Sequence, residues 1–260
     1  MSASGEDEAI LVIGPSWVGD MVMAQALFGI LKQARPERPI DLVAPAWALP
    51  LAARMSEIRH AFPLPAGHGE LGLASRYRLG KSLQGRYGQA ILLPNSFKSA
   101  LVPWFAGISR RTGFLGELRF GLLNDIHPLD KKRLPRTVQR FVALGLPRGA
   151  SPPESFPLPR LSASPHDGER ILADHGLTSG KPLLALCPGA EYGGAKRWPA
   201  RHFAAVARAR IARGWRVAVL GSAKERALGA SILSDLDGPL GGGSPGSGGP
   251  RTGGVHSGSS

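Results

Sequence analysis

Residues 9–35 read AILVIGPSWVGDMVMAQALFGILKQAR, and this stretch decides the fold. The apolar run Ala9–Gly14 ends at a glycine, which is typical of a buried parallel strand. From Asp20 to Arg35 the apolar residues recur at helical spacing, so the sequence predicts a helix immediately after the strand. A strand that passes through a glycine turn into a helix is the first half of a βαβ unit.

The same alternation continues through the first 150 residues. Further strands are expected at 40–44 and 89–93, and helices at 47–55, 71–86, 96–106 and 136–146. Such spacing predicts an α/β fold with a parallel sheet and right-handed crossovers. Residues 1–150 are therefore expected to form one Rossmann-like domain.

The composition then changes twice. Residues 151–165 contain five prolines and are expected to link two domains. Strands at 183–187 and 216–221, with helices at 202–213 and 223–236, predict a second α/β domain over residues 166–237. A doubly wound sheet usually has about five or six strands, so this domain is expected to be incomplete. Residues 238–260 are rich in glycine and serine and predict a disordered tail, as a truncated or frameshifted reading frame would produce.

Composition restricts the classes of function. The 260 residues include 32 Lys and Arg against 19 Asp and Glu, a net charge of +13 that attracts polyanions. No recognition-helix, RNP-type or zinc-finger pattern accompanies the charge, so nucleic-acid binding is disfavoured. No apolar run is long enough for a membrane-spanning helix, and the polar start lacks a secretory signal, which favours the cytoplasm. The single cysteine, Cys187, is expected to pack at the end of a buried strand, and no HExxH pair suggests a metal.

The first candidate site is the turn GPSWVGD, residues 14–20. In an open α/β sheet the loops at the carboxyl ends of the strands form the ligand crevice. The turn is not a GxGxxG dinucleotide fingerprint. Asp20 has two interpretations, because aspartate is a good helix N-cap and also a possible catalytic carboxylate.

The second candidate is PGAEYGGAKRWP, residues 188–199, between a strand and a helix. Backbone N–H groups of a glycine-rich loop and two adjacent cations suit a diphosphate, although the loop is not a Walker A motif. A third candidate is the basic stretch from Arg110 to Arg140, with Lys98 before it. This stretch is either a solvated charged face or a site for an acidic acceptor.

Four blocks together resemble a known family. They are ILVIGPSWVGDMVMAQAL (10–27), ILLPNSFKSALVPWFAGISRRTGF (91–114), GLLND (121–125) and CPGAEYGGAKRWPARHFA (187–204). These blocks are similar to the ADP-heptose:lipopolysaccharide heptosyltransferases, and closest to members that add the second inner-core heptose. The resemblance implies a GT-B fold of two Rossmann-like domains, with inverting transfer that uses no metal and no cofactor.

The resemblance also assigns roles to residues. Asp20 would be the general base. Lys196 and Arg197, with the backbone of Gly189 and Ala190, would hold the donor diphosphate, and Glu225 would lie near the nucleoside. The residues implied to bind the acceptor are Gly19, Asn95, Ser96, Lys98, Arg111 and Arg136.

The implied partners are ADP-heptose and heptosyl-Kdo2-lipid A. The implied location is the cytoplasmic face of the inner membrane, in peripheral contact with its anionic surface. The family's later Asp-Ser/Thr-Gly motif does not follow Glu225 in this sequence. Three alternatives stay open: a non-catalytic remnant of the family, a sibling enzyme that adds a different core heptose, and a basic nucleic-acid-binding protein.

Overall fold

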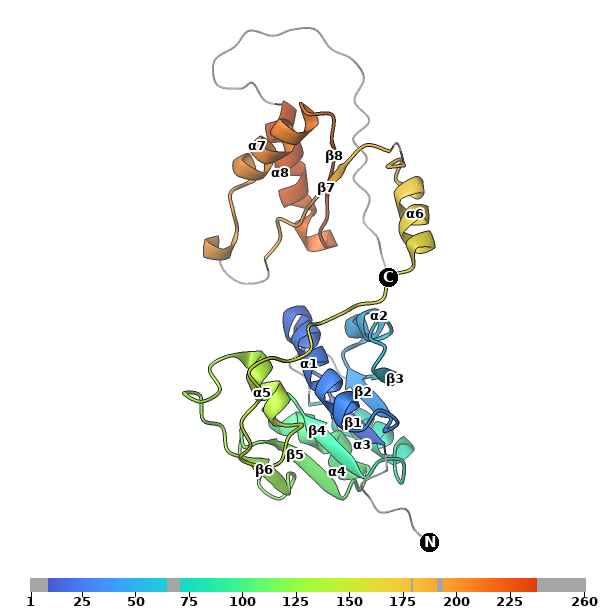
Figure 1. The fold of residues 1–260 in the computed structure, drawn as a ribbon, viewed down its shortest axis with the longest axis vertical. Coiled ribbons are helices and arrows are strands. Elements are labelled where there is room, and N and C mark those ends of the chain that lie inside the picture. Colours follow the sequence, from blue (N-terminus) through green and yellow to red (C-terminus); the bar gives the residue numbers. More distant parts are fainter. Residues whose placement is uncertain (1–8, 65–70, 179, 191–193, 238–260) are drawn as a thin grey trace. The chain divides into compact units, whose positions relative to one another are not determined.

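The structure, a computed structural model, describes residues 9–64, 71–178, 180–190 and 194–237 (Figure 1). The expected tail at 238–260 lies outside the described residues. The chain divides into two compact units, Met1–Ser162 and Ala163–Ser260. The division falls within the proline-rich stretch 151–165 that the sequence marks as a linker.

The first unit contains a six-stranded parallel sheet in the order β3-β2-β1-β4-β5-β6. The strands are β1 (Ile10–Ile13), β2 (Ile40–Ala44), β3 (Ile58–Pro63), β4 (Gln89–Leu92), β5 (Arg110–Phe114) and β6 (Asp125–His127). The predicted α/β class and parallel sheet are therefore confirmed. The chain leaves β1 for β2 on one side and returns to β4 on the other, which makes the β1/β4 boundary the topological switch point.

Helices cover both faces of this sheet (Figure 1). They are α1 (Val18–Ala34), the 3-10 turn η1 (Ala46–Ala48), α2 (Leu49–Ala52), α3 (Leu73–Ser82), the 3-10 turn η2 (Phe97–Ala100), α4 (Leu101–Phe105) and α5 (Thr137–Ala143). Alternate residues of β1 point to opposite faces: Ile10 and Val12 join a core with α1 and α5, whereas Leu11 and Ile13 join a core with α3 and α4. Both faces are buried, which explains why the strand sequence is continuously apolar.

Three strands of this unit are not predicted by the sequence pattern. β3 is an edge strand whose residues are only partly covered, so it lacks the apolar run of a central strand. β5 begins with two arginines, and β6 has only three residues. Each is held in the sheet by pairing with a neighbour distant in sequence, which local periodicity does not report.

The proline-rich stretch is docked onto the first unit rather than free of it. The buried Gln25 side chain of α1 accepts a hydrogen bond from Arg160 N at 2.8 Å and donates to Arg160 O at 2.7 Å. Ser162 N donates to Arg54 O at 2.8 Å. Pro157 covers Gly29, where an added Cβ would lie 2.9 Å from the proline ring. We call residues 157–162 the strap.

The second unit contains a parallel pair, β7 (Leu183–Leu186) and β8 (Arg216–Val219). Its helical elements are α6 (Pro165–Asp174), η3 (Gly194–Lys196), α7 (Ala200–Ile211), η4 (Ala223–Glu225) and α8 (Arg226–Asp237). α6 was not predicted, although Ser164 followed by Pro165 is a helix-start signal: the Ser164 hydroxyl accepts from Asp167 N at 3.2 Å. The expectation of a packed Cys187 is wrong, because β7 is only partly covered and the thiol is exposed.

Candidate active site

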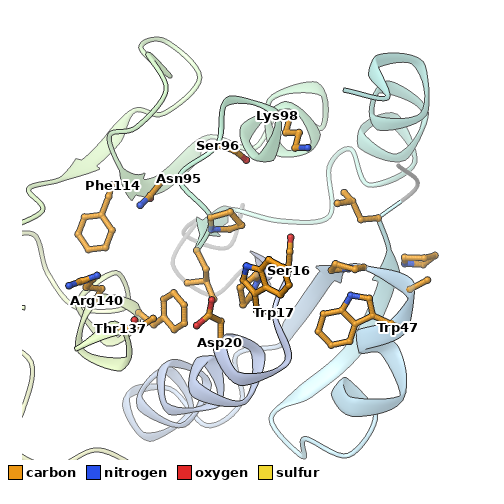
Figure 2. Close-up of a pocket in the computed structure, with 18 of the residues that line it drawn as sticks. Ser16, Trp17, Asp20, Trp47, Asn95, Ser96, Lys98, Phe114, Thr137 and Arg140 are labelled. Carbon is orange, nitrogen blue, oxygen red and sulfur yellow. The ribbon is translucent and has the colours of Figure 1, made fainter. Parts of the chain in front are cut away.

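A cavity of about 920 Å³ opens at the carboxyl edge of the first unit's sheet (Figure 2). It lies across the β1/β4 switch point, where doubly wound sheets bind ligands. The turns that follow β1, β2 and β4, the ends of β3 and β5, and α5 all contribute to its wall. The polar and aromatic lining residues include Ser16, Trp17, Asp20, Trp47, Arg76, Asn95, Ser96, Lys98, Phe114, Thr137 and Arg140.

Asp20 is the acidic residue of this wall. It lies in the first turn of α1 but is not its N-cap: Trp17 holds that position, and no side chain caps the helix. The capping interpretation of Asp20 is therefore wrong, because the helix begins two residues earlier than its apolar periodicity indicates. Burial raises the pKa of Asp20 above its usual value of 3.8. The structure thus places a half-buried carboxylate at the cavity with an increased affinity for a proton.

The PNSFK segment after β4 forms another part of the wall. Asn95, Ser96 and Lys98 all line the cavity, in agreement with their expected position (Figure 2). The fully buried guanidinium of Arg119 holds this segment: its Nη1 donates to Pro94 O and to Ser99 Oγ, both at 2.9 Å. Its Nη2 donates to Phe114 O at the end of β5. Burial lowers the pKa of Arg119 to about 10, so its charge persists at neutral pH.

Two lining residues, Trp47 and Arg76, were not among the sequence candidates for the site, and Arg140 was named only as the end of the basic stretch. Trp47 follows β2 and is 44% exposed. Arg140 comes from α5, and its guanidinium donates to Leu134 O and Pro135 O, both at 2.9 Å. Arg76 is buried and donates to Leu71 O at 2.7 Å and Lys98 O at 3.1 Å. Trp47 could have been predicted, because it follows a strand. Arg76 and Arg140 reach the cavity only through the packing of α3 and α5.

Three expected acceptor residues are not brought to the cavity wall. Arg111 lies at the amino end of β5, the opposite edge of the sheet, and donates to Leu122 O at 2.7 Å and Ile108 O at 2.5 Å. Its burial lowers its pKa, and its role here is to join backbone segments. Arg136 precedes α5 and lies over the Phe156 ring, 5.7 Å from its centroid. Gly19 is exposed on the outer side of the first turn of α1.

The second unit gathers the expected donor residues at the carboxyl ends of β7 and β8. Gly189 and Ala190 follow β7, and Arg197 donates to Ala190 O at 3.1 Å. Lys196 ends η3 and is exposed. Glu225 follows β8 and packs against Gly189 so closely that any side chain at position 189 would collide with the carboxylate.

Glu225 also has a structural function. Its carboxylate accepts from Ser222 N at 2.6 Å and Ser222 Oγ at 2.9 Å, which closes a capping box before α8. These hydrogen bonds, with a smaller contribution from Arg197, lower its pKa. The second unit therefore presents glycine backbone, two cations and an ionised carboxylate at one edge of its sheet.

Within the described part of the chain, no cluster of three or more His, Cys, Asp or Glu side chains is placed to hold a metal ion. Among the described helices, none has the length and apolar character to cross a bilayer.

Comparisons with known proteins agree with this arrangement. Residues 76–239 match the model of glycosyltransferase family 9 (heptosyltransferase). The chain is 48% identical over 234 residues to lipopolysaccharide heptosyltransferase 2 of Salmonella typhimurium, covering 88% of this chain and 67% of that protein. It is 46% identical to lipooligosaccharide heptosyltransferase 2 of Haemophilus influenzae, covering 87% of this chain and 67% of that protein.

The structure also matches that of Escherichia coli ADP-heptose lipopolysaccharide heptosyltransferase II. The TM-score is 0.81 at 45% identity, covering 88% of this chain and 69% of the other. Two α/β units, each with a parallel sheet and a polar carboxyl edge, define a glycosyltransferase of the GT-B class. The chain belongs to glycosyltransferase family 9, the heptosyltransferases.

Proposed function

We propose that this protein transfers L-glycero-D-manno-heptose from ADP-heptose to the heptosyl-Kdo2-lipid A inner core, with inversion at the anomeric carbon. The observation that carries the proposal is Asp20, a carboxylate of raised pKa in a large cavity at the switch point of the first sheet. The names of the relatives, heptosyltransferases 2 of lipopolysaccharide and lipooligosaccharide, support the choice of donor and acceptor class.

The chemistry requires one base. The oxygen of an acceptor hydroxyl attacks the anomeric carbon of the donor as the bond to the ADP oxygen breaks, and the hydroxyl proton passes to Asp20. The bonding electrons leave with ADP. A carboxylate in a partly desolvated site is a stronger base than one in water, and burial raises the pKa of Asp20 in this way. A single displacement by one base inverts the anomeric configuration, unlike the double displacement of a retaining glycosidase.

The remaining wall of the cavity suits an acidic sugar. Lys98 and Arg140 place positive charge beside the cavity, where the carboxylates of Kdo would be attracted. Trp17 and Trp47 follow neighbouring strands and leave 40% and 44% of their surfaces exposed. Such indole faces bury the apolar faces of sugar rings, and Asn95 and Ser96 offer hydrogen bonds to hydroxyl groups.

The residues proposed to bind the donor all belong to the second unit. Negative charge grows on the diphosphate as the glycosidic bond breaks, so cations that meet it stabilise the transition state more than the ground state. Lys196 and Arg197 supply these cations, and the backbone N–H groups of Gly189 and Ala190, which follow β7, would add hydrogen bonds to the phosphate oxygens. Glu225, held ionised by Ser222, would accept a hydrogen bond from the nucleoside.

We assign the reaction to the cytoplasmic face of the inner membrane, where a cytoplasmic nucleotide sugar would meet a lipid-anchored acceptor. The net charge of +13 favours peripheral association with an anionic surface.

The experiment is a transfer assay with the whole chain, ADP-heptose and three acceptors that carry no heptose, one heptose or two. We expect product with the one-heptose acceptor and a loss on the order of 10²- to 10⁴-fold for Asp20→Asn. Preference for another acceptor would identify a sibling enzyme of the family. Absence of transfer to all three would refute the proposed activity of this chain.

A further inference from the structure

Large apolar side chains point into solvent from the segment Leu115–Phe120, which follows β5 and which we call the 115–120 loop. Leu118 is 81% exposed and Phe120 is 64% exposed, among the most exposed large apolar residues that the structure describes. Arg119 between them is fully buried. The loop therefore places two hydrophobic residues outward and one cation inward, the reverse of the usual pattern.

The outward orientation is built into the loop. Arg119 donates to the carbonyls of Pro94 and Phe114, which fixes the middle of the loop against the ends of β4 and β5. The Glu117 carboxylate accepts from Phe97 N at 2.7 Å and brings the loop beside Phe97, which is itself 42% exposed. Glu117 and Leu118 have φ values of 45° and 53°, a conformation that costs energy in residues other than glycine. Binding of a partner by the exposed Leu118 side chain would offset this conformational free energy.

Basic residues follow the neighbouring strand at the same edge of the sheet. β5 and β6 are parallel neighbours, with Phe114 beside His127, so the loops that follow them start side by side. The loop after β6 carries Lys131, Lys132 and Arg133, all exposed. The nearby Asp130 carboxylate accepts from the backbone N–H groups of Lys132 and Arg133, at 2.8 Å and 3.2 Å. The three side chains are exposed, and the Arg133 guanidinium also donates to Ser151 Oγ at 2.9 Å.

We propose that the 115–120 loop inserts Leu118 and Phe120 into the interfacial region of an anionic bilayer, while Lys131, Lys132 and Arg133 contact its headgroups. The proposal rests on the proposed function, in which the acceptor is a glycolipid. The acceptor cavity and the loop share the carboxyl edge of the sheet, because Phe114 lines the cavity and Leu115 begins the loop. A membrane at this edge would present the sugar of a lipid-anchored acceptor to the cavity.

The combination of signals is what favours a bilayer over another occupant. Stable association of a peripheral protein with a membrane needs an apolar anchor together with a basic cluster. Aromatic and leucine side chains supply the first, and each Lys or Arg near an anionic surface strengthens binding by about fivefold. Both signals occur here on adjacent loops.

The first test is co-sedimentation of the whole chain with vesicles of phosphatidylethanolamine and phosphatidylglycerol, compared with neutral phosphatidylcholine vesicles. We expect binding to the anionic vesicles that weakens with salt. L118S/F120S and K131E/K132E should each reduce the vesicle partition coefficient by at least about tenfold. Leu158→Ser is the matched control, because Leu158 is 82% exposed but lies in the strap, and it should leave binding unchanged.

Equal binding by L118S/F120S and the wild type would overturn the proposal. Analytical ultracentrifugation of the two variants tests the alternative that these residues join copies of the chain. If the variants lose self-association but keep vesicle binding, the proposal is also overturned. Circular dichroism checks that the variants are folded.

A second assay separates this proposal from the proposed function. With an acceptor embedded in vesicles, L118S/F120S should lose most of the transfer rate, whereas with a deacylated, water-soluble acceptor it should match the wild type. If the wild type transfers heptose to the soluble acceptor but does not bind vesicles, the proposed function is supported and the membrane proposal for the 115–120 loop is refuted. If vesicle binding depends on the 115–120 loop but neither acceptor receives heptose, the membrane proposal is supported and the proposed function is refuted.

Discussion

Asp20, the proposed base, is expected to lower the stability of the fold at neutral pH. Its pKa is raised in the folded protein by burial, so the folded state binds a proton more tightly than the unfolded state. At a pH above both pKa values the carboxylate is ionised in both states, and the desolvation of its charge destabilises the fold. The destabilisation disappears as the pH falls below the unfolded value of 3.8.

Asp20→Asn is therefore expected to keep or slightly raise the Tm at pH 7 while it abolishes transfer. Asparagine preserves the shape and removes the charge, and Asp20 makes no capping hydrogen bond that would be lost. Thermal unfolding at pH 7 and pH 4 measures the effect, and the gain should shrink at the lower pH. A Tm several degrees lower than that of the wild type would show that Asp20 mainly supports the helix.

The same raised pKa is expected to set the pH dependence of the proposed reaction. The base is active only when ionised, so kcat/KM should fall on the acidic side through a pKa higher than that of an ordinary aspartate. A pH–rate profile on the soluble acceptor measures this limb. Acid inactivation at the pKa of an unperturbed carboxyl would show that burial does not act on the base during turnover.

Lys196 is predicted to act on the transition state. Lys196→Ala should lower kcat as well as donor affinity, because the ammonium meets charge that grows on the diphosphate. Lys181→Ala, an exposed lysine of the same unit, is the matched control and should leave both constants unchanged. A raised KM for ADP-heptose with an unchanged kcat would instead indicate uniform binding.

At the scale of elements, the contact between α3 and α4 depends on a glycine. A Cβ on Gly80 would lie 2.5 Å from Phe105 Cβ and 2.9 Å from Val102 O, and backbone cannot yield as a flexible side chain can. Gly80→Ala should therefore lower the stability of the first unit by about 1–3 kcal/mol, despite the better helix propensity of alanine. Urea denaturation measures the change.

Gly168 in α6 provides the comparison. Nothing lies within 4 Å of the Cβ that alanine would add there. Gly168→Ala should thus show only the propensity gain of up to about 1 kcal/mol for α6. Similar effects of the two substitutions would mean that the close approach of α3 and α4 is not maintained in solution.

In the molecule as a whole, the first unit includes the proline-rich stretch up to Ser162, and the strap docks the last six of these residues. Limited proteolysis of the wild type should yield an N-terminal fragment that ends near Ser162, because residues 157–162 are held by Gln25, Arg54 and Gly29. Gln25→Leu removes both hydrogen bonds to Arg160 and should move cleavage into the strap. Mass spectrometry of the fragments locates the cut.

Gln84→Leu is the control for this prediction, because the exposed Gln84 side chain accepts a hydrogen bond from Lys81 Nζ of α3 at 3.3 Å. It should give the wild-type fragment. Cleavage between residues 157 and 161 in the wild type would show that the strap is not docked.

The fold class and the candidate site motifs can be read from the sequence because they depend on short-range patterns. The apolar runs of β1, β2 and β4 are buried on both faces, and α1 has helical periodicity, so each segment carries its own signal. The motifs GPSWVGD, PNSFK and PGAEYGGAKRWP follow three of the predicted strands. Topology places the first two at one cavity, as the rule for parallel sheets predicts.

Which cations lie at the cavity depends on the tertiary structure and could not be predicted from the sequence. Arg111 and Arg140 belong to the same basic stretch of sequence, yet one joins loops at the amino edge of the sheet and the other lines the cavity. The side of the sheet on which a guanidinium lies depends on whether it begins a strand or comes from a helix that packs over the far end. Likewise, the raised pKa of Asp20 and the burial of Arg119 result from segments distant in sequence that exclude water from them, and this exclusion exists only after the chain has folded.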